Sequence, residues 1–359
     1  PGRQGQAGAP ALMARIAVVT STPPMAEGGH MVIARSLARA LEEQGHEAGV
    51  VCTPQNRFGR LASSYVATWF TDVGRTGDGH PVDQVISLRY PSYAVRHPRH
   101  VCWLNHTMRE YYDLWDRWCV TLPAHARLKE SLRRAATHKV DKYLLTRNVT
   151  KLFVQSKTIH KRLERFGGIP SEVLYPPAPQ RPYRNDGYGD YLFVVSRLTK
   201  LKRIDLVIRA LARPEAAGVR CLIGGEGEDR AALERLIKEE KLDNRVTLLG
   251  RLDDGQLVEH LAKCRAVCFA PYDEDYGFVT IEAFSSSKAV VTCRDSGGPA
   301  ELVRDGENGL VAEPDAQALA VSIARVMNDE EAARRMGAAA AADAARITWA
   351  HAVSKLVIV

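Results

Sequence analysis

Two carboxylates and a glycine stand close together in the carboxyl-terminal half of the chain. Glu274 follows an apolar, strand-like run, Glu282 stands eight residues later, and Gly277 lies between them where a helix is expected to begin. The first N–H groups of a helix, here those of Gly277, Phe278 and Val279, have no partner within it and lie at the positive end of its dipole, which suits a diphosphate. Glu282, on the first turns of that helix, could accept hydrogen bonds from the hydroxyls of a ribose, and Glu274 from those of a sugar.

A pair of glutamates at this spacing is common by chance, so the alternative is a surface Glu274 and an exposed, helical Glu282. The surrounding pattern makes this alternative less attractive. The pair lies in a succession of strand, glycine turn, helix and second strand, followed by the run Gly297-Gly298-Pro299-Ala300-Glu301. We therefore predict a ligand site here, at the end of a strand.

The elements that must position these residues are short apolar strands alternating with helical patterns, as in parallel sheets with crossover helices. The expected fold is α/β, with two Rossmann-like, doubly wound parallel-sheet domains facing a central cleft. Ligands should collect at the carboxyl ends of the strands. The predicted strands are residues 15–20, 47–52, 84–88, 100–104 and 151–156 in the first half, and 191–196, 219–225, 246–250, 266–271, 289–293 and 309–313 in the second.

A proline-rich stretch from Tyr175 to Pro179 separates the two halves. It can continue neither a helix nor a central strand, so we expect an interdomain hinge. Residues 1–13 are predicted to be a disordered leader or expression remnant. The amino-terminal domain is predicted at residues 14–178 and the carboxyl-terminal domain at residues 179–345. Residues 346–359 are predicted to form a helix that packs back on the first domain.

The composition is that of an ordinary soluble globular protein, with 45% apolar and 25% charged residues and no apolar run long enough to span a bilayer. The seven cysteines lie mostly in apolar, strand-like runs and form no Cys-x-x-Cys pair, so we expect buried, reduced thiols of a cytoplasmic protein. Cys264 and Cys268 stand four residues apart, but no His or further Cys completes a zinc set, so we predict no structural metal.

The net charge of +7 is distributed unevenly. Residues 1–178 carry 24 Lys and Arg against 14 Asp and Glu, whereas residues 179–359 carry 25 against 28. Residues 117–165 alone hold 13 basic and 3 acidic side chains. This stretch could attract an anionic acceptor or an anionic membrane surface, or it could be a solvated helical face. Nucleic acid is not an expected partner, because no binding motif accompanies the charge.

The segment 271–303 resembles the E-x7-E donor motif of the retaining family 4 glycosyltransferases of GT-B fold, with Glu274 and Glu282 as its two glutamates. The similarity covers the whole second domain and continues more weakly through the first. It implies an enzyme that moves a hexose-type sugar from a nucleoside diphosphate sugar, such as a UDP- or GDP-sugar, to an acceptor hydroxyl with retention of configuration. The second domain would bind the nucleotide sugar, and the first would be on the acceptor side.

The resemblance implies further donor contacts in the second domain. Arg197 and Lys202 match the basic pair that neutralises the diphosphate, on which negative charge grows as the glycosidic bond breaks. Gly225 lies in a glycine turn that the family places near the donor nucleotide. Leu249 and Arg251 match the strand end that contacts its base.

Three residues of the first domain also match. Gly28 and Gly29 correspond to a glycine loop that approaches the donor phosphates and sugar, although an ordinary helix start is the alternative. His106 resembles the active-site histidine that touches the sugar, the alternative being a satisfied core histidine. The catalytic residues implied are His106, Arg197, Lys202 and Glu274.

Asp273, Glu274 and Asp275 also form an Asp-x-Asp triplet, which binds a divalent metal in glycosyltransferases of a different fold. The triplet here lies in the second of two Rossmann-like domains, where Arg197 and Lys202 are available for the diphosphate. We therefore expect no catalytic metal and no cofactor besides the nucleotide sugar.

The chain departs from the family pattern in two places. Ser287 and Ala289 stand where the family usually has Gly and Pro after the donor helix, which changes the helix cap. An unusually aromatic and basic stretch, residues 89–118, flanks His106. It is expected either to shape an acceptor pocket or to form a flap of the hydrophobic core.

Two other functions stay open, a nucleotide-sugar epimerase of the same fold and a non-catalytic sugar-nucleotide-binding protein. The acceptor could be a glycolipid, a polysaccharide or a small natural product, and it could be anionic or membrane-associated. We expect a cytoplasmic location, with a peripheral position at the inner face of the membrane as the variant. Base, sugar, acceptor, linkage and oligomeric state are undetermined by the sequence.

Overall fold

A computed structural model describes residues 13–23, 28–55 and 60–359, which form two compact units. The predicted leader lies outside the described residues except for Met13. Unit 1 contains the described residues up to Val154, with Arg162–Leu174 and Trp349–Val359, and unit 2 contains Gln155–Lys161 and Tyr175–Thr348.

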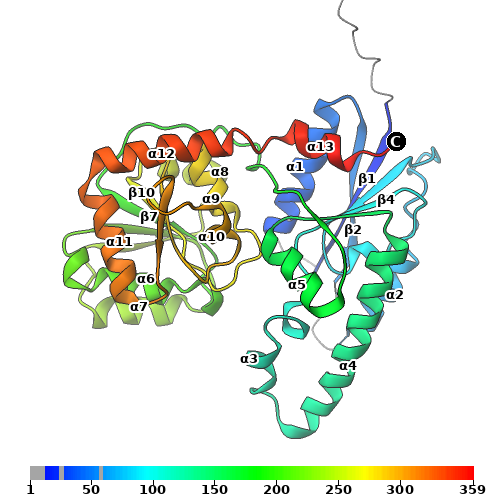
Figure 1. The fold of residues 1–359 in the computed structure, drawn as a ribbon, viewed down its shortest axis with the longest axis horizontal. Helices are drawn as coiled ribbons and strands as arrows, with labels where there is room; N and C mark the ends of the chain where they lie inside the picture. The colour runs from blue at the N-terminus through cyan, green and yellow to red at the C-terminus, as the bar shows by residue number, and fades with distance from the viewer. Residues whose placement is uncertain (1–12, 24–27, 56–59) are drawn as a thin grey trace, which may run out of the picture. The chain divides into compact units, whose positions relative to one another are not determined.

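Unit 1 is built on a sheet of six parallel strands in the order β2-β1-β3-β4-β5-β6 (Figure 1). The strand order reverses between β1 and β3, as in a doubly wound sheet. The strands are β1 (Arg15–Thr22), β2 (Glu47–Pro54), β3 (Gln84–Ser87), β4 (His100–Leu104), β5 (Lys151–Val154) and β6 (Glu172–Val173).

Helix α1 of unit 1 buries one apolar face against β1 and β2. In α1 the buried residues Ile33, Leu37 and Leu41 recur every four positions, and α13 lies beside α1 (Figure 1). Gln84 fixes the end of the chain, because its side chain donates to Leu356 O at 2.6 Å and accepts from Ile358 N at 2.8 Å. The helices are α1 (Gly29–Glu43), α2 (Leu61–Trp69), η1 (Ser92–Ala94), η2 (Arg109–Tyr111), α3 (Trp115–Cys119), α4 (Ala124–Tyr143), the π-helical turn η3 (Leu144–Asn148), α5 (Lys157–Gly167) and α13 (Trp349–Leu356). The first part of α5, up to Lys161, belongs to unit 2.

The aromatic stretch 89–118 contributes to the core of unit 1. Tyr90, Tyr93, Tyr111 and Tyr112 are buried. The hydroxyls of Tyr93 and Tyr112 donate to the carboxylate of Asp141 in α4, at 2.6 and 2.7 Å. These contacts favour the core alternative for this stretch over the acceptor pocket.

Unit 2 has a second sheet of six parallel strands, in the order β12-β11-β10-β7-β8-β9. The order reverses between β7 and β10, which are neighbours in the sheet although β8 and β9 lie between them in the sequence. The strands are β7 (Tyr191–Val195), β8 (Arg220–Gly224), β9 (Val246–Gly250), β10 (Ala266–Cys268), β11 (Val290–Cys293) and β12 (Gly309–Ala312).

Alternate residues of these strands enter two separate apolar cores, because successive side chains of a strand point to opposite faces. Leu192 and Val194 join one core, and Phe193 joins the other. Helices therefore cover both faces, as a parallel sheet requires. They are η4 (Lys200–Lys202), α6 (Ile204–Leu211), η5 (Pro214–Ala216), α7 (Arg230–Glu239), α8 (Asp254–Lys263), α9 (Phe278–Ser285), α10 (Gly298–Leu302), α11 (Ala316–Asn328) and α12 (Glu330–Ala344).

The predicted fold class, an α/β chain with two Rossmann-like parallel-sheet domains, is confirmed by these two sheets. All eleven predicted strands are present, with ends shifted by three residues or fewer, and β6 was not predicted.

Candidate functional site

The predicted site residues of unit 2 collect at one edge of its sheet, because the strands are parallel and their carboxyl ends meet there. Each of them lies at the carboxyl end of a strand, in the loop that follows the strand, or in the first turns of the next helix. Arg197 follows β7, Gly225 follows β8, Leu249 and Arg251 lie at the end of β9, and Glu274 follows β10, with Gly277, Phe278, Val279 and Glu282 at or in α9.

Lys202 and Glu274 form an ion pair across the point where the strand order reverses. Lys202 Nζ lies 2.6 Å from Glu274 Oε2, and the two side chains are 14% and 21% exposed. The lysine ammonium also lies 5.5 Å from the centre of the Phe269 ring. Since an ammonium carries three donors and the carboxylate uses one, Lys202 retains donors for a phosphate.

Arg203 holds the loop that carries Lys202. Its backbone is left-handed, with φ of 48°, which is unusual for a residue with a side chain. Its guanidinium makes a bidentate pair with Asp295, at 2.8 and 2.7 Å, and donates to Ala270 O at 2.8 Å. The loop after β7 is therefore tied to the ends of β10 and β11. No local sequence pattern points to Arg203 or Asp295 as partners, because they are 92 residues apart.

The backbone of Glu274 is held by the loop after β11. Its N–H donates to Ser296 O at 2.9 Å, and its carbonyl accepts from Gly298 N at 2.8 Å. The Gly297-Gly298 pair is thus explained by local packing, because glycines there allow the loops after β10 and β11 to lie side by side. Glu301, the last residue of that run, accepts from the N–H groups of Lys157 and Thr158, at 2.8 and 2.5 Å, and so caps the start of α5.

Helix α9 begins with free backbone donors. Gly277 has φ of 78°, and a Cβ there would lie 2.6 Å from Phe269 Cε1, so only glycine fits without rearrangement. Within the part of the chain that the structure describes, the N–H groups of Gly277, Phe278 and Val279 have no hydrogen-bond partner. This is the arrangement expected of an anion site at a helix start.

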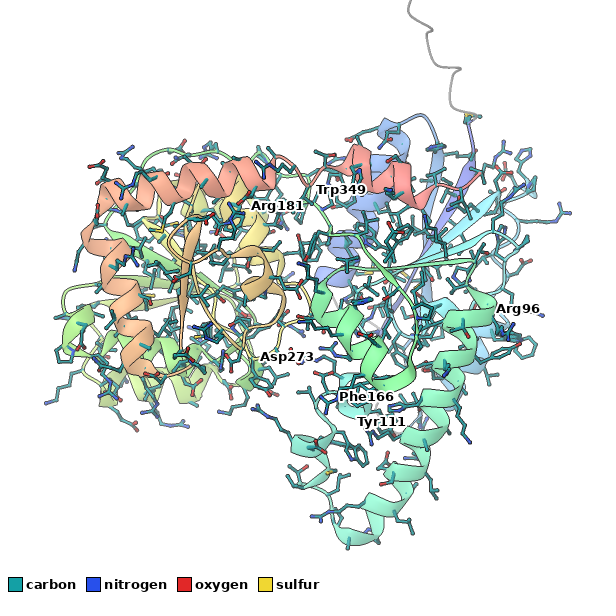
Figure 2. The ribbon with its side chains drawn as sticks, viewed as in Figure 1. Arg96, Tyr111, Phe166, Arg181, Asp273 and Trp349 are labelled. Carbon is teal, nitrogen blue, oxygen red and sulfur yellow. The ribbon has the colours of Figure 1, made fainter. Side chains whose placement is uncertain are left out.

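Glu282 is buried, so the alternative of an exposed helical glutamate is wrong. Its Oε1 accepts from Arg181 Nη1 and from the hydroxyl of Tyr183, the latter at 3.1 Å. Burial raises the pKa of Glu282, and the Arg181 guanidinium opposes that rise. Its Oε2 has no partner among the described residues and is available to a ligand. Figure 2 shows Arg181 well away from Asp273, the residue directly before Glu274. Because Arg181 contacts Glu282, the two glutamates have different surroundings.

Arg197 and Arg251 are exposed. Neither side chain makes a hydrogen bond or ion pair with a residue in the described ranges. Gly225 has φ of 130°, and a Cβ on it would lie 1.8 Å from Ser196 O. Glycine there is required by the packing of the two loops after β7 and β8, whether or not a ligand binds. Leu249 is half-buried in β9.

The remaining predicted residues belong to unit 1. His106 follows β4, is half-buried, and its Nδ1 lies 2.7 Å from Thr107 O. A carbonyl oxygen only accepts, so Nδ1 carries the proton in this contact. Gly28 caps α1 with extended backbone, φ 179°, and Gly29 is the first residue of the helix. Residues 24–27 of this loop lie outside the described residues.

In the described parts of the chain, no three His, Cys, Asp or Glu side chains are grouped so as to hold a metal ion. The carboxylates of Asp273, Glu274 and Asp275 are therefore not grouped in this way. No helix of the described residues combines the length and apolar character that crossing a membrane demands.

Comparison with known proteins finds a family model that matches most of unit 2. Residues 180–343 match the family model described as "Glycosyl transferases group 1". An exopolysaccharide phosphotransferase of Streptomyces coelicolor is 31% identical over 202 residues, which are 55% of this chain and 21% of that protein. A D-inositol 3-phosphate glycosyltransferase of Nocardia farcinica is 34% identical over 172 residues, 45% of this chain and 38% of that protein. The chain thus spans well under half the length of either relative.

A solved structure supports the fold over nearly the whole chain. The crystal structure of HepE from Anabaena, in complex with UDP and glucose, is 19% identical, with a TM-score of 0.67 over 94% of this chain and 98% of that one.

Proposed function

We propose that this chain, whose residues 180–343 match the family model described as "Glycosyl transferases group 1", transfers a hexose-type sugar from a nucleoside diphosphate sugar to an acceptor hydroxyl, with retention of configuration. The observation that carries the proposal is the Lys202–Glu274 pair, placed at the reversal of the strand order in unit 2 and followed directly by the uncapped start of α9. Ligands of doubly wound sheets bind at such a point.

The diphosphate is the group that these donors fit. The exposed guanidinium of Arg197, the ammonium of Lys202 and the first N–H groups of α9 supply fixed positive charge and hydrogen-bond donors. As the bond from the anomeric carbon to the phosphate oxygen breaks, its electron pair goes to the diphosphate, and these groups stabilise the growing charge. They do the work that a metal ion does elsewhere, so activity should persist in excess chelator.

The two glutamates take different parts of the donor. Glu274 lies beside Lys202 and would accept hydrogen bonds from hydroxyls of the transferred sugar. Glu282 is buried and held by Arg181 and Tyr183, with Oε2 available to the ribose hydroxyls. The donor contacts of His106, Gly28 and Gly29 are implied by the resemblance alone and stay predictions. No carboxylate is assigned as a covalent nucleophile, so the acceptor hydroxyl attacks from the face that the diphosphate leaves, and its proton passes to the departing phosphate oxygen.

The names of the similar proteins agree with this donor class. The Nocardia relative is named a glycosyltransferase, and the Anabaena protein was crystallised with UDP and glucose. UDP- and GDP-sugars are therefore the first donors to test, and the acceptor would be a glycolipid, a polysaccharide or a small natural product.

A thermal-shift screen of UDP-, GDP-, ADP- and dTDP-sugars tests donor binding, followed by incubation with candidate acceptors. We expect one nucleotide series to raise the melting temperature and to yield a glycosylated acceptor. Lys202→Met should abolish the shift, and Lys200→Met is the matched control, since Lys200 lies on the same turn, is 78% exposed and pairs only with Asp229 among the described residues. Conversion of the donor to its epimer in the absence of an acceptor would favour a nucleotide-sugar epimerase over a transferase. Donor binding without turnover would favour a non-catalytic sugar-nucleotide-binding protein. Loss of activity in chelator, restored by manganese, would contradict the metal-free site.

A further inference from the structure

Helix α4 carries large apolar side chains on its solvent-facing side. Leu128 is 69% exposed, Leu132 is 66% exposed and Tyr143, at the last position of the helix, is 58% exposed. Residues at these spacings share one face of a helix, with Lys139 within that face and Lys142 at its edge. We call these five residues the α4 outer face.

The opposite side of α4 is polar and buried. Its buried residues are Glu130, Thr137 and Asp141. Asp141 accepts hydrogen bonds from tyrosine hydroxyls, and Glu130 accepts from Tyr111 at 2.5 Å. A surface helix ordinarily buries its apolar side and exposes its polar side. Helix α4 is therefore held to unit 1 by hydrogen bonds, while its leucines stand in water.

The exposed charges of α4 are all positive. Its two acidic residues, Glu130 and Asp141, are the buried ones, whereas Arg127, Lys129, Lys139 and Lys142 are exposed. Val120, just before α4, is also apolar and 65% exposed. Figure 1 shows α3 beside the first turns of α4, in the part of unit 1 that extends from its sheet. The segment thus offers apolar and cationic groups together, with no exposed carboxylate on the helix.

We propose that the α4 outer face binds the surface of an anionic lipid bilayer. The leucines and Val120 would enter the boundary between head groups and acyl chains, and the lysines would lie at the lipid phosphates. The exposed positive charges of α4 favour an anionic partner. The exposed leucines favour a partner that has an apolar layer directly below its charged surface, as a bilayer has. A single exposed helix is convex, so it suits a plane interface better than it suits a peptide, which binds in a groove.

This inference goes beyond the proposed function and rests on different residues, so it can fail while that function stands. Sedimentation of the full chain with vesicles tests it, using phosphatidylcholine alone and phosphatidylcholine mixed with phosphatidylglycerol, and no sugar donor. We expect binding to the mixed vesicles only, weakened by added salt.

Matched variants separate the two contributions. Leu128→Asn with Leu132→Asn should reduce binding at least about tenfold, since two apolar side chains no longer leave water. Lys139→Gln with Lys142→Gln should reduce it about 30-fold, since each lysine contributes roughly fivefold near an anionic surface. Controls are Val66→Asn with Val321→Asn, which are 56% and 51% exposed in other helices, and Lys238→Gln with Lys355→Gln.

All of these positions are exposed, so circular dichroism and melting temperature should match those of the parent chain. The proposal is overturned if the parent chain binds neither kind of vesicle. It is also overturned if the double leucine variant binds the mixed vesicles as tightly as the double valine control variant does. Binding to polyglutamate in place of vesicles would also overturn it, in favour of an acidic protein partner.

Discussion

The guanidinium of Arg181 contacts two carboxylates from different helices, the buried Glu282 of α9 through Nη1 and the exposed Asp254 of α8 through Nη2, the latter at 2.9 Å. Tyr183, two residues further along, donates to the same oxygen of Glu282. The segment after the predicted hinge therefore fixes the glutamate assigned to the donor ribose. Arg181 is a positioning residue in this arrangement, since it acts through Glu282.

Arg181→Met should weaken donor binding and destabilise unit 2. Without the cation, the pKa of Glu282 rises further, so donor affinity should fall more steeply as the pH is lowered through it. Leaving one partner of a buried pair uncompensated costs roughly 3 kcal/mol. Donor KM measured against pH, with urea unfolding, checks both effects. Arg184→Met is the control, because Arg184 is 45% exposed and pairs with surface carboxylates. If the dependence of donor KM on pH is the same in Arg181→Met as in the parent chain, Arg181 has a structural role only.

Glu274→Gln should lower kcat about 100-fold with little change in melting temperature, because it removes the carboxylate from the reacting sugar but keeps an acceptor for Lys202. Lys202→Met should lose a similar factor. Since both residues act on one donor, the double variant should lose much less than the product of the two factors. Steady-state kinetics of the four proteins checks this, and near-normal turnover of Glu274→Gln would contradict the assignment.

The sequence predicted the sheets well because their strands are continuous apolar runs, whose burial on both faces is a local property. It missed β6, which has only two residues, 172 and 173. It also identified the donors at the start of α9, since a glycine after a strand and before a helix is a local signal. It could not identify Arg181 as a partner of Glu282 or Arg203 as a partner of Asp295, because those pairs are separated by 101 and 92 residues.

His100 should make unit 1 sensitive to acid. It is fully buried in β4, where desolvation lowers its pKa from 6.5 to about 4, and its Nε2 lies 2.8 Å from Ser87 Oγ. Between pH 6.5 and 4 the unfolded chain binds this proton and the folded chain does not, so stability falls as the pH is lowered, by about 3 kcal/mol in total. His100→Gln should flatten this dependence in urea unfolding. His125→Gln, at an exposed position of α4, should leave it unchanged.

Ser287 occupies a position that suits glycine. It follows α9 with φ of 56°, in the left-handed region, which explains why the family usually has Gly where this chain has Ser. Ser287→Gly should relieve the Cβ strain while keeping the carbonyl that accepts from Tyr188 Oη at 2.8 Å. Because glycine also gains freedom in the unfolded chain, the net stabilisation should be about 0.5 to 1 kcal/mol, or about 2 °C in melting temperature.

Ser285→Gly is the matched control for this substitution, since Ser285 is two residues earlier in the same segment and is the last residue of helix α9. Glycine there loses the hydrogen bond from Ser285 Oγ to Ile281 O, and it lowers helix propensity, so the melting temperature should fall. Opposite signs for the two serine-to-glycine variants would confirm that backbone conformation, and not side-chain loss, decides the effect. A fall in melting temperature for both would show that the Ser287 side chain contributes more to stability than its left-handed backbone costs.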